Sequence, residues 1–387
     1  MTKTAREIGQ SLFPAPGREK LMRDQGVLEL LEGTPGASTR RSAEAIEDYA
    51  RAAATGDTQA QYELAKLLVS RNTLSTENRE AVKWLRKAAA RDHAASEALL
   101  GLLYARGQGV HPNPERAVEL FHTAALAGNA DAQYHLGVAM EHGFGTPEDP
   151  HGALTWYRLA GAQGHVLSQL KVGKCYETGI GCRPDPVQAA LWLRRAASQG
   201  YAPAQLELGL FYANEKESRG ENREKEAVRW ITAAASDGLP DAQYRLALLY
   251  AIGRGVAANP AKAISWAKAS ASQGNPNALL FLASALQRGD GVEQNIASAL
   301  ALTLRAQEQT DGELGRDMIG ALEAVASPSE RSVAQKLSAR YPEDSALVAA
   351  LFWAVCGHCS RSNTGLLLTQ GIFLLFFQLK PLFSRRF

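Results

Sequence analysis

The chain has 387 residues, of which 45% are hydrophobic and 21% charged, and its formal net charge at pH 7 is +2. This composition is typical of a soluble globular protein, and so small a net charge gives no electrostatic field that would favour nucleic-acid binding. Four cysteines are too few for a disulfide-stapled framework, so we expect a reducing, cytoplasmic setting. Ala-rich segments with few β-branched runs favour helices.

The N-terminal extension, residues 1–41, is expected to be partly disordered or to form one helix. Its first twenty residues contain no apolar stretch of signal-peptide length, which argues against secretion by that route. Residues 42–56 (SAEAIEDYARAAATG) then have the pattern of one helix closed by Gly56.

Seven related segments follow, each built around a small residue inside an apolar stretch. Successive small residues are 36 positions apart, with one interval of 38 positions. A second marker keeps the same phase: an alanine and then an aromatic residue or leucine follow each small residue, and five of the six tryptophans occupy this place. A fixed period of this length is the signature of a repeat protein. The small residues are Ala65, Gly101, Gly137, Gly173, Gly209, Ala247 and Ala283. The tryptophans are Trp84, Trp156, Trp192, Trp230 and Trp266.

Each segment has the pattern of two helices. The first carries apolar residues on one helix face and, in five segments, ends in Gly-x-Gly, which suits the left-handed conformation at a helix C-terminus. The second opens with Asn-Pro or Asp-Pro in four segments, an N-cap side chain followed by proline at the first helical position. Segments one and five lack Gly-x-Gly, so their turns (70–80 and 214–226) should differ. No single pair of helices can bury its apolar stripe alone, so we predict one continuous stack.

The predicted fold class is therefore all-α: a right-handed α-solenoid of about seven two-helix repeats of 36 residues. The pattern A-x-x-x-L-G-x-x-Y-x-x-G-x-G-V, then D-x-x-x-A-x-x-W-x-x-x-A-A-x-x-G, resembles the Sel1-like repeat, a relative of the tetratricopeptide repeat. The resemblance covers about residues 42–310, and residues 311–342 resemble the helices that close such arrays. One segment alone matches at ten positions: Ala132, Leu136, Gly137, Gly143, Gly145, Asp149, Ala153, Trp156, Ala160 and Gly164.

This resemblance implies a non-enzymatic scaffold, bacterial and cytoplasmic, that binds a partner protein or peptide and needs no cofactor and no nucleic acid. By analogy with tetratricopeptide proteins, the concave groove lined by the first helices would hold the partner. Aromatic residues interleaved with both signs of charge suit a peptide held by stacking and hydrogen bonds. The alternative is that the tyrosines pack between repeats and the charges are solvated. The groove candidates are Tyr62, Lys66, Arg106, Tyr134, Glu141, His142, Lys174, Glu177, Asn214 and Tyr244.

Catalytic chemistry has little support in the sequence. The Gly-x-Gly pairs follow helices rather than strands, and none continues into a nucleotide-binding motif. The eight histidines form no zinc-ligand pair, and no G-x-S-x-G nucleophile motif occurs. We therefore expect no catalytic residue and no metal, with a hydrolase or thiol redox enzyme as the less favoured alternative. Cys175 and Cys182 should behave as small buried hydrophobes.

The C-terminal tail, residues 343–387, differs abruptly in composition from the repeats. Its Cys356-Gly-His-Cys359 would be a redox motif in a thioredoxin-like fold, but too few residues follow it for the strands of that fold. Two apolar runs within residues 346–379 each fall short of the roughly 20 residues that span a bilayer. We favour a tail that caps the last repeat or is foreign to the domain. A membrane-tethered adaptor anchored through residues 346–379 is the alternative.

Overall fold

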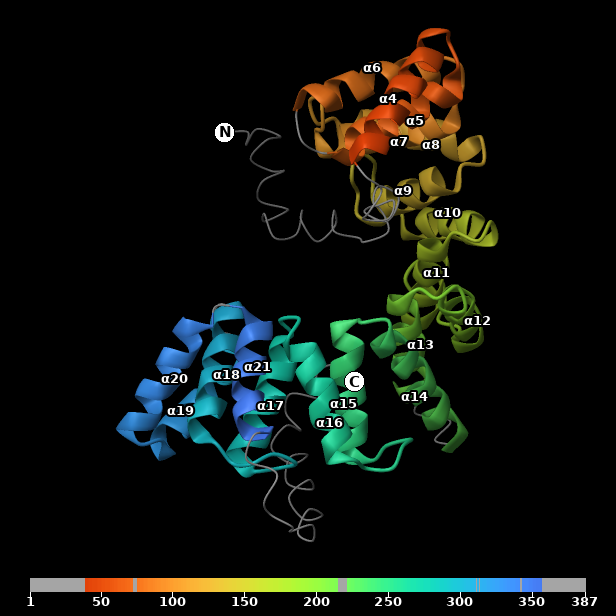
Figure 1. Cartoon of the computed structure of the whole chain (residues 1–387). Coiled ribbons are helices and arrows are strands. Elements are labelled where there is room, and N and C mark those ends of the chain that lie inside the picture. The colour runs from red at the N-terminus through yellow and green to blue at the C-terminus, as the bar shows by residue number, and fades with distance from the viewer. Residues whose placement is uncertain are drawn as a thin grey trace, which may run out of the picture. The chain divides into compact units, whose positions relative to one another are not determined.

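The computed structural model describes residues 39–71, 75–214, 221–310, 312, 314–341 and 343–356. These residues form eighteen α-helices and no strand (Figure 1), which confirms the predicted all-α solenoid of paired helices. The helices are α4 (Thr39–Ala54), α5 (Thr58–Arg71), α6 (Ser75–Ala89), α7 (Ala94–Arg106), α8 (Pro114–Leu126), α9 (Ala130–Glu141), α10 (Pro150–Ala162), α11 (Val166–Thr178), α12 (Pro186–Ala197), α13 (Ala202–Asn214), α14 (Glu221–Ser236), α15 (Pro240–Ile252), α16 (Pro260–Ala271), α17 (Pro276–Arg288), α18 (Ile296–Gln309), α19 (Arg316–Val325), α20 (Pro328–Arg340) and α21 (Asp344–Cys356).

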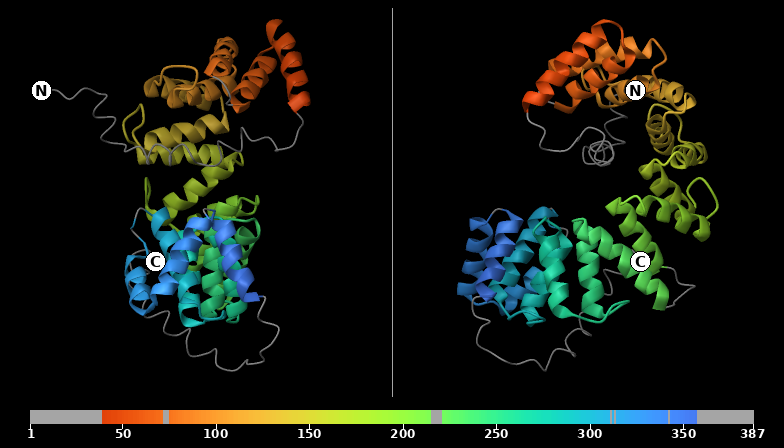
Figure 2. Two further views of the ribbon diagram at one scale, coloured as in Figure 1. Left: turned by 60° about the vertical axis from the view of Figure 1, so that its left-hand side comes forward. Right: turned by 45° about the vertical axis from the view of Figure 1, so that its right-hand side comes forward.

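The helices divide into two compact units, one ending at Trp192 and the other beginning at Leu193, inside α12. Within each unit, successive helices form hairpins that stack one after another (Figure 2). The closest packing joins the two helices of one hairpin. These pairs are α5/α6, α7/α8 and α9/α10 in the first unit, and α13/α14, α15/α16 and α17/α18 in the second.

The predicted N-caps of the second helices are confirmed. The Oδ1 atom of Asn113 accepts a hydrogen bond from the backbone N–H of Arg116 at 2.8 Å, and proline occupies the first turn of α8. This bond satisfies one of the N–H groups that have no partner within the helix. The same cap recurs at Asp149, Asp185, Asn259 and Asn295.

The Gly-x-Gly turns both end a helix and bring neighbouring repeats together. Gly179, the first glycine of one pair, ends α11 with a φ of 81°, in the left-handed region that favours glycine. Gly145, the second glycine of another pair, has a φ of +68°, and a Cβ at this position would lie 2.3 Å from the carbonyl oxygen of Pro114. The turn therefore lies directly on the start of the preceding second helix, where only glycine leaves enough room.

The core is a series of apolar clusters that neighbouring repeats share. Trp266 of α16 packs against the cluster that contains Leu246 and also against the cluster that contains Leu282. A large ring at this place fills the gap between successive repeats, which explains why tryptophan recurs there.

Three further helices follow the last repeat. Helices α19 and α20 lie within residues 311–342, the stretch predicted to close the array, and α20 begins with a capping box formed by Ser327 and Glu330. Helix α21 packs against α16 and α18 and buries Leu347 and Phe352 in the last core cluster. This part of the apolar tail lies against the last repeats, whereas the second apolar run and Cys359 lie outside the described residues. Among the described helices, none combines the length and the apolar character needed to cross a membrane.

Candidate interaction surface

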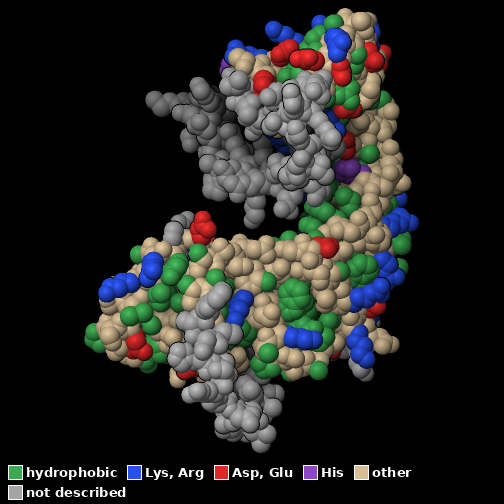
Figure 3. All heavy atoms as spheres, viewed as in Figure 1, with side chains coloured by type: hydrophobic (Ala, Val, Ile, Leu, Met, Phe, Trp, Pro, Cys, Tyr) green, Lys and Arg blue, Asp and Glu red, His purple; other side chains and the backbone are tan. Residues whose placement is uncertain are grey.

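The first helices of the first unit bring ring and charged side chains of successive repeats together. α5, α7, α9 and α11 begin 36 residues apart, so their first turns and the residues before them line up along the stack. The rings of Tyr62 and His93 lie 5.6 Å apart, and those of Tyr134 and His165 lie 5.0 Å apart, measured between centroids. We call this surface the first-helix face, and define it by Tyr62, His93, Asp131, Tyr134, His135 and His165. In the space-filling view, histidine and acidic side chains reach the surface near α9 (Figure 3).

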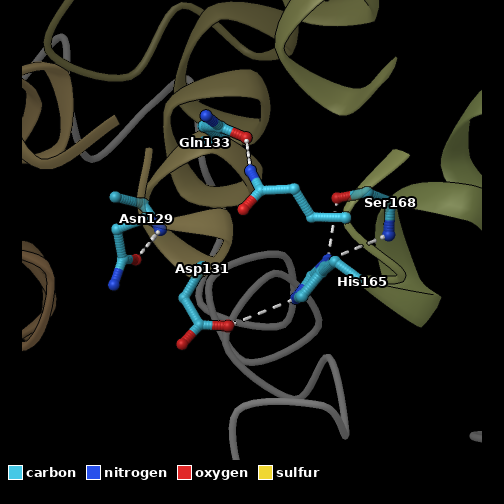
Figure 4. Close-up of polar contacts among 7 residues, drawn as sticks. Asn129, Asp131, Gln133, His165 and Ser168 are labelled. Carbon is cyan, nitrogen blue, oxygen red and sulfur yellow. Dashed lines mark hydrogen bonds and ion pairs between the residues drawn. The ribbon is translucent and has the colours of Figure 1, made fainter. Parts of the chain in front are cut away.

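His165 connects two repeats at the centre of this face. As N-cap of α11, its Nδ1 accepts a hydrogen bond from the backbone N–H of Ser168 at 3.2 Å and lies 2.8 Å from the Ser168 hydroxyl. The proton of a neutral ring must then sit on Nε2, which faces Oδ1 of Asp131 on α9 at 3.5 Å (Figure 4). Burial lowers the pKa of His165, and the Asp131 charge opposes that effect.

A related arrangement occurs two repeats earlier, without the cap bond from the backbone. His93 precedes α7, its Nδ1 lies 2.8 Å from the hydroxyl of Ser96, and its Nε2 lies 3.2 Å from Oε1 of Gln59. An amide oxygen thus takes the place that the Asp131 carboxylate has at His165. In the second unit, Asn275 plays the equivalent part and donates to Asp241 at 2.8 Å.

Asp131, His165 and Ser168 have the order of contacts found in a Ser-His-Asp triad, which bears on the hydrolase alternative. In such a triad the serine must reach the substrate. Here Ser168 is 0% exposed, and its backbone and hydroxyl both serve the N-cap of α11. The recurrence with Gln59 shows that the repeat forms this arrangement without a carboxylate. Capping of α11 accounts for the contact at His165, whereas the His93 side chain makes no cap bond to the backbone.

His135 lies beside this cluster and stacks on Phe121, with ring centroids 5.2 Å apart. Burial, followed by the neighbouring His165 and Arg106, lowers the pKa of His135 to about 3. The ring is therefore neutral at neutral pH. Arg106, which is half-buried at the end of α7, brings a positive charge close to this ring.

A second polar cluster joins α9, α10 and α11. The Tyr157 hydroxyl donates to Glu141 Oε2 at 2.5 Å, and Lys171 Nζ lies 3.0 Å from the same oxygen. Burial alone would raise the pKa of Glu141, but the Lys171 charge and the hydrogen bonds from Tyr157 and Lys171 outweigh it and lower the pKa. The carboxylate is thus held ionised and links successive repeats.

The ten groove candidates are spread over both units and differ in exposure. Tyr134 is only 3% exposed, and its ring contacts His135, Tyr157 and His165. Glu141 belongs to the ion pair with Lys171. Partner contact by any of the ten stays a prediction. Half-buried are Tyr62, Lys66, Arg106, Glu141 and Tyr244; exposed are His142, Lys174, Glu177 and Asn214. All lie in the first unit except Asn214 and Tyr244.

Sequence reasoning missed His93, Asp131 and His165. A signal was present, because His93 and His165 occupy the same repeat position, immediately before a first helix. The pairing of His165 with Asp131, 34 residues earlier, depends on how one repeat stacks on the next, and no local pattern reports that.

Cysteine and metal chemistry has no further support among the described residues. They contain no group of three or more His, Cys, Asp or Glu side chains that could hold a metal ion. Cys175 is buried, as predicted, and burial raises the pKa of its thiol to about 11, so it stays protonated at neutral pH. Cys182 is partly exposed. The side chain of Cys356 and all of Cys359 lie outside the described residues, so the redox hypothesis keeps only its sequence argument.

Similar solved structures include proteins described as Sel1 repeat or SLR-fold proteins. The Sel1 repeat protein of Oxalobacter formigenes is 30% identical over 65% of this chain and 96% of its own, with a TM-score of 0.57. A protective antigen of uropathogenic Escherichia coli with an SLR fold is 24% identical over 85% of each chain, with a TM-score of 0.36. No curated protein matches the sequence.

The family model described as Sel1 repeat matches the chain seven times in succession. The matched residues are 58–93, 94–129, 130–165, 166–201, 202–239, 240–275 and 276–311. Each match begins at or next to the start of a first helix. Because the matches together cover well over half of the sequence, the chain belongs to the Sel1 repeat family.

Proposed function

We propose that the chain is a non-enzymatic scaffold that holds an extended segment of a partner protein on the first-helix face of its first unit. Sel1 repeat proteins generally act as protein-interaction scaffolds. A stack of repeats offers an elongated surface on which a partner can make the same kind of contact several times.

The observation that carries this proposal is the mixture of side chains on the first-helix face. The half-buried rings of Tyr62, His135 and His165 lie near Asp131 and Arg106, which carry opposite charges. Aromatic and arginine side chains dominate binding energies at protein interfaces, since they combine large contact areas with directed hydrogen bonds. Lys66, His142, Lys174 and Glu177 would extend this surface.

Asn214 and Tyr244 belong to the second unit and are proposed for a corresponding surface there. Burial raises the pKa of the Tyr244 phenol, which is therefore a neutral donor at neutral pH. A partner that contacts both units would gain affinity through linkage of two weaker contacts.

A random peptide library displayed on phage would test the proposal. Peptides selected on the full chain should bind Arg106→Ala/Asp131→Ala at least tenfold more weakly. The matched control is Arg116→Ala/Glu119→Ala, which removes one positive and one negative charge from an exposed pair on α8. Peptides that bind both variants as tightly as the wild type would place the interaction elsewhere. Failure to select any peptide that competes in solution would argue against peptide binding altogether.

A further inference from the structure

A cavity of about 470 Å³ opens between α6 and the turn that joins α7 to α8. None of the residues proposed above for the first-helix face lines it. The size is within the usual range of small-molecule sites. Its walls include Arg79, Lys83, Arg86, Tyr104, Val110 and Pro112.

The charge of this cavity is one-sided. Arg79, Lys83 and Arg86 lie at successive turns of α6 and are exposed, and His111 faces them from the turn. Among the described residues that line it, none is acidic. Three positive charges around one hollow raise its potential and attract anions.

Comparison between repeats shows that the fold does not require these charges. In the next three repeats, the positions equivalent to Arg79 and Lys83 hold acidic, polar or apolar residues. The positions equivalent to Arg79, Lys83 and Arg86 are all basic only in the first repeat. The fifth repeat has Lys225 and Arg229 but Thr232 in the third place. The residues in the next three repeats are Glu115 and Glu119, His151 and Thr155, and Val187 and Leu191.

The hollow is preformed by contacts within the first unit. Arg86 donates to the Tyr104 hydroxyl at 2.8 Å, which fixes its guanidinium over the rim. The backbone N–H of Asn113 donates to the Tyr104 carbonyl at 3.0 Å, which closes the turn. At Gly109 the turn packs closely on α6, since a Cβ at this position would lie 2.5 Å from the Asn78 backbone. Little rearrangement is needed before a ligand binds, which favours affinity.

We propose that this cavity binds a phosphomonoester carried on an apolar or aromatic group. A phosphate dianion matches three neighbouring positive charges better than a single carboxylate does, and guanidinium groups bind its oxygens in pairs. A cavity of this volume has room for more than the phosphate. Val82, Val110 and Pro112 provide the apolar surface on which the remainder of the ligand would lie.

Calorimetric titration of the full chain with phenyl phosphate tests the assignment. We expect saturable binding that weakens with added salt and falls at least tenfold in Arg79→Glu/Lys83→Glu. This variant introduces the two residues that the second repeat carries at the same places, so it is compatible with the fold. The charge-matched control is Lys336→Glu/Arg340→Glu, which reverses two exposed basic residues four positions apart on α20 and should bind as the wild type does.

Comparison ligands separate the parts of the proposal. Inorganic phosphate and benzoate should each bind at least tenfold more weakly than phenyl phosphate, because each lacks either the apolar group or the dianion. If benzoate bound as tightly as phenyl phosphate, the assignment to a phosphomonoester would be refuted. If inorganic phosphate bound as tightly as phenyl phosphate, the apolar subsite would be refuted. No binding to the wild type, or equal loss in both double variants, would overturn the site itself. None of these outcomes depends on the first-helix face.

Discussion

Glu97 is a buried acid at a position where five other repeats have glutamine. In four of those repeats the amide donates to a backbone carbonyl eight residues earlier, as Gln133 does to Ala125 at 3.1 Å. An ionised glutamate cannot donate such a bond. Glu97 is 7% exposed, and burial, together with the charge of Asp92, raises the pKa of its carboxyl. The glutamines are Gln61, Gln133, Gln169, Gln205 and Gln243.

We predict that Glu97→Gln stabilises the protein at pH 7 by about 1 kcal/mol, the typical net value of one hydrogen bond. Because the folded-state pKa is raised, the proton on Glu97 stabilises the fold fully below the ordinary value of 4.5. That contribution is lost as the pH rises through the raised pKa. The advantage of the variant should therefore shrink towards pH 4. Urea unfolding at both pH values measures it.

Glu80→Gln, an exposed position on α6, is the control and should change stability little at either pH. A Glu97→Gln protein that is less stable than the wild type at pH 7 would show that the carboxylate has a native partner.

His135 gives the opposite dependence on pH. Its pKa of about 3 in the folded protein lies below the ordinary value of 6.5, so the unfolded chain takes up the proton first. Between pH 7.5 and pH 5 the wild type should lose about 2 kcal/mol at this residue. The variant His135→Leu has at this position the residue that stands one repeat earlier, Leu99. It should not lose this stability. The comparison of unfolding curves at both pH values, with exposed His111→Asn as control, decides the matter: parallel losses in wild type and His135→Leu would refute the prediction.

At the scale of helices, a small residue on one helix of a hairpin faces a larger side chain on the other where the two come closest. Where the first helix has glycine, the second offers a large side chain: a Cβ on Gly137 would lie 2.6 Å from the ring of Tyr157, and one on Gly101 would lie 2.8 Å from Phe121. Ala65 stands at the same place in the first repeat, opposite Leu85, and a Cβ on Gly209 would lie 2.5 Å from Ile231. The glycines are thus required by packing and not by φ.

Gly137→Ala should therefore destabilise the protein by about 1–3 kcal/mol, the usual cost of overpacking. Tyr157 is fully buried and is bound to Glu141, so its ring cannot move aside. In Tyr157→Leu, the same glycine substitution should cost at least about 1 kcal/mol less. A thermodynamic cycle of the two single variants and the double variant measures this coupling, and a coupling near zero would show that the ring and residue 137 do not compete for space.

What the sequence predicts well at this scale is local. Asn113, Asp149 and the glycines of the turns act within a few residues, so their identity alone indicates where each helix begins and ends. The size match of Gly137 with Tyr157 spans twenty residues and was not predicted, although both residues stand in recognisable repeat positions. His165 and Asp131 lie further apart still, and their contact depends on the stacking of whole repeats.

At the scale of the whole molecule, the repeat architecture makes interactions between sequence neighbours dominant. Most of the packing joins helices that are neighbours along the chain, with weaker packing of α5 on α7 and of α7 on α9, and α18 also packs on α20. The period therefore predicts the solenoid, since every repeat needs the same neighbours. It does not predict which surface binds a partner, because the residues proposed to bind a ligand, such as Arg79 and Lys83, are those that depart from the repeat.

Because each repeat is stabilised mainly by its neighbours, a destabilising substitution at one end of the chain should affect only nearby helices. Leu347 of α21 is 0% exposed, whereas Ala349 on the same helix is exposed. Leu347→Asp would bury an unpaired charge, so hydrogen exchange should accelerate at least about tenfold in α16, α18 and α21. Exchange in α5 to α10 should not change, because those helices share no core cluster with α21. Ala349→Asp should leave both regions unchanged. If exchange rose equally throughout the chain in Leu347→Asp, the repeats would unfold as one cooperative block, and stability would not be a sum of neighbouring contacts.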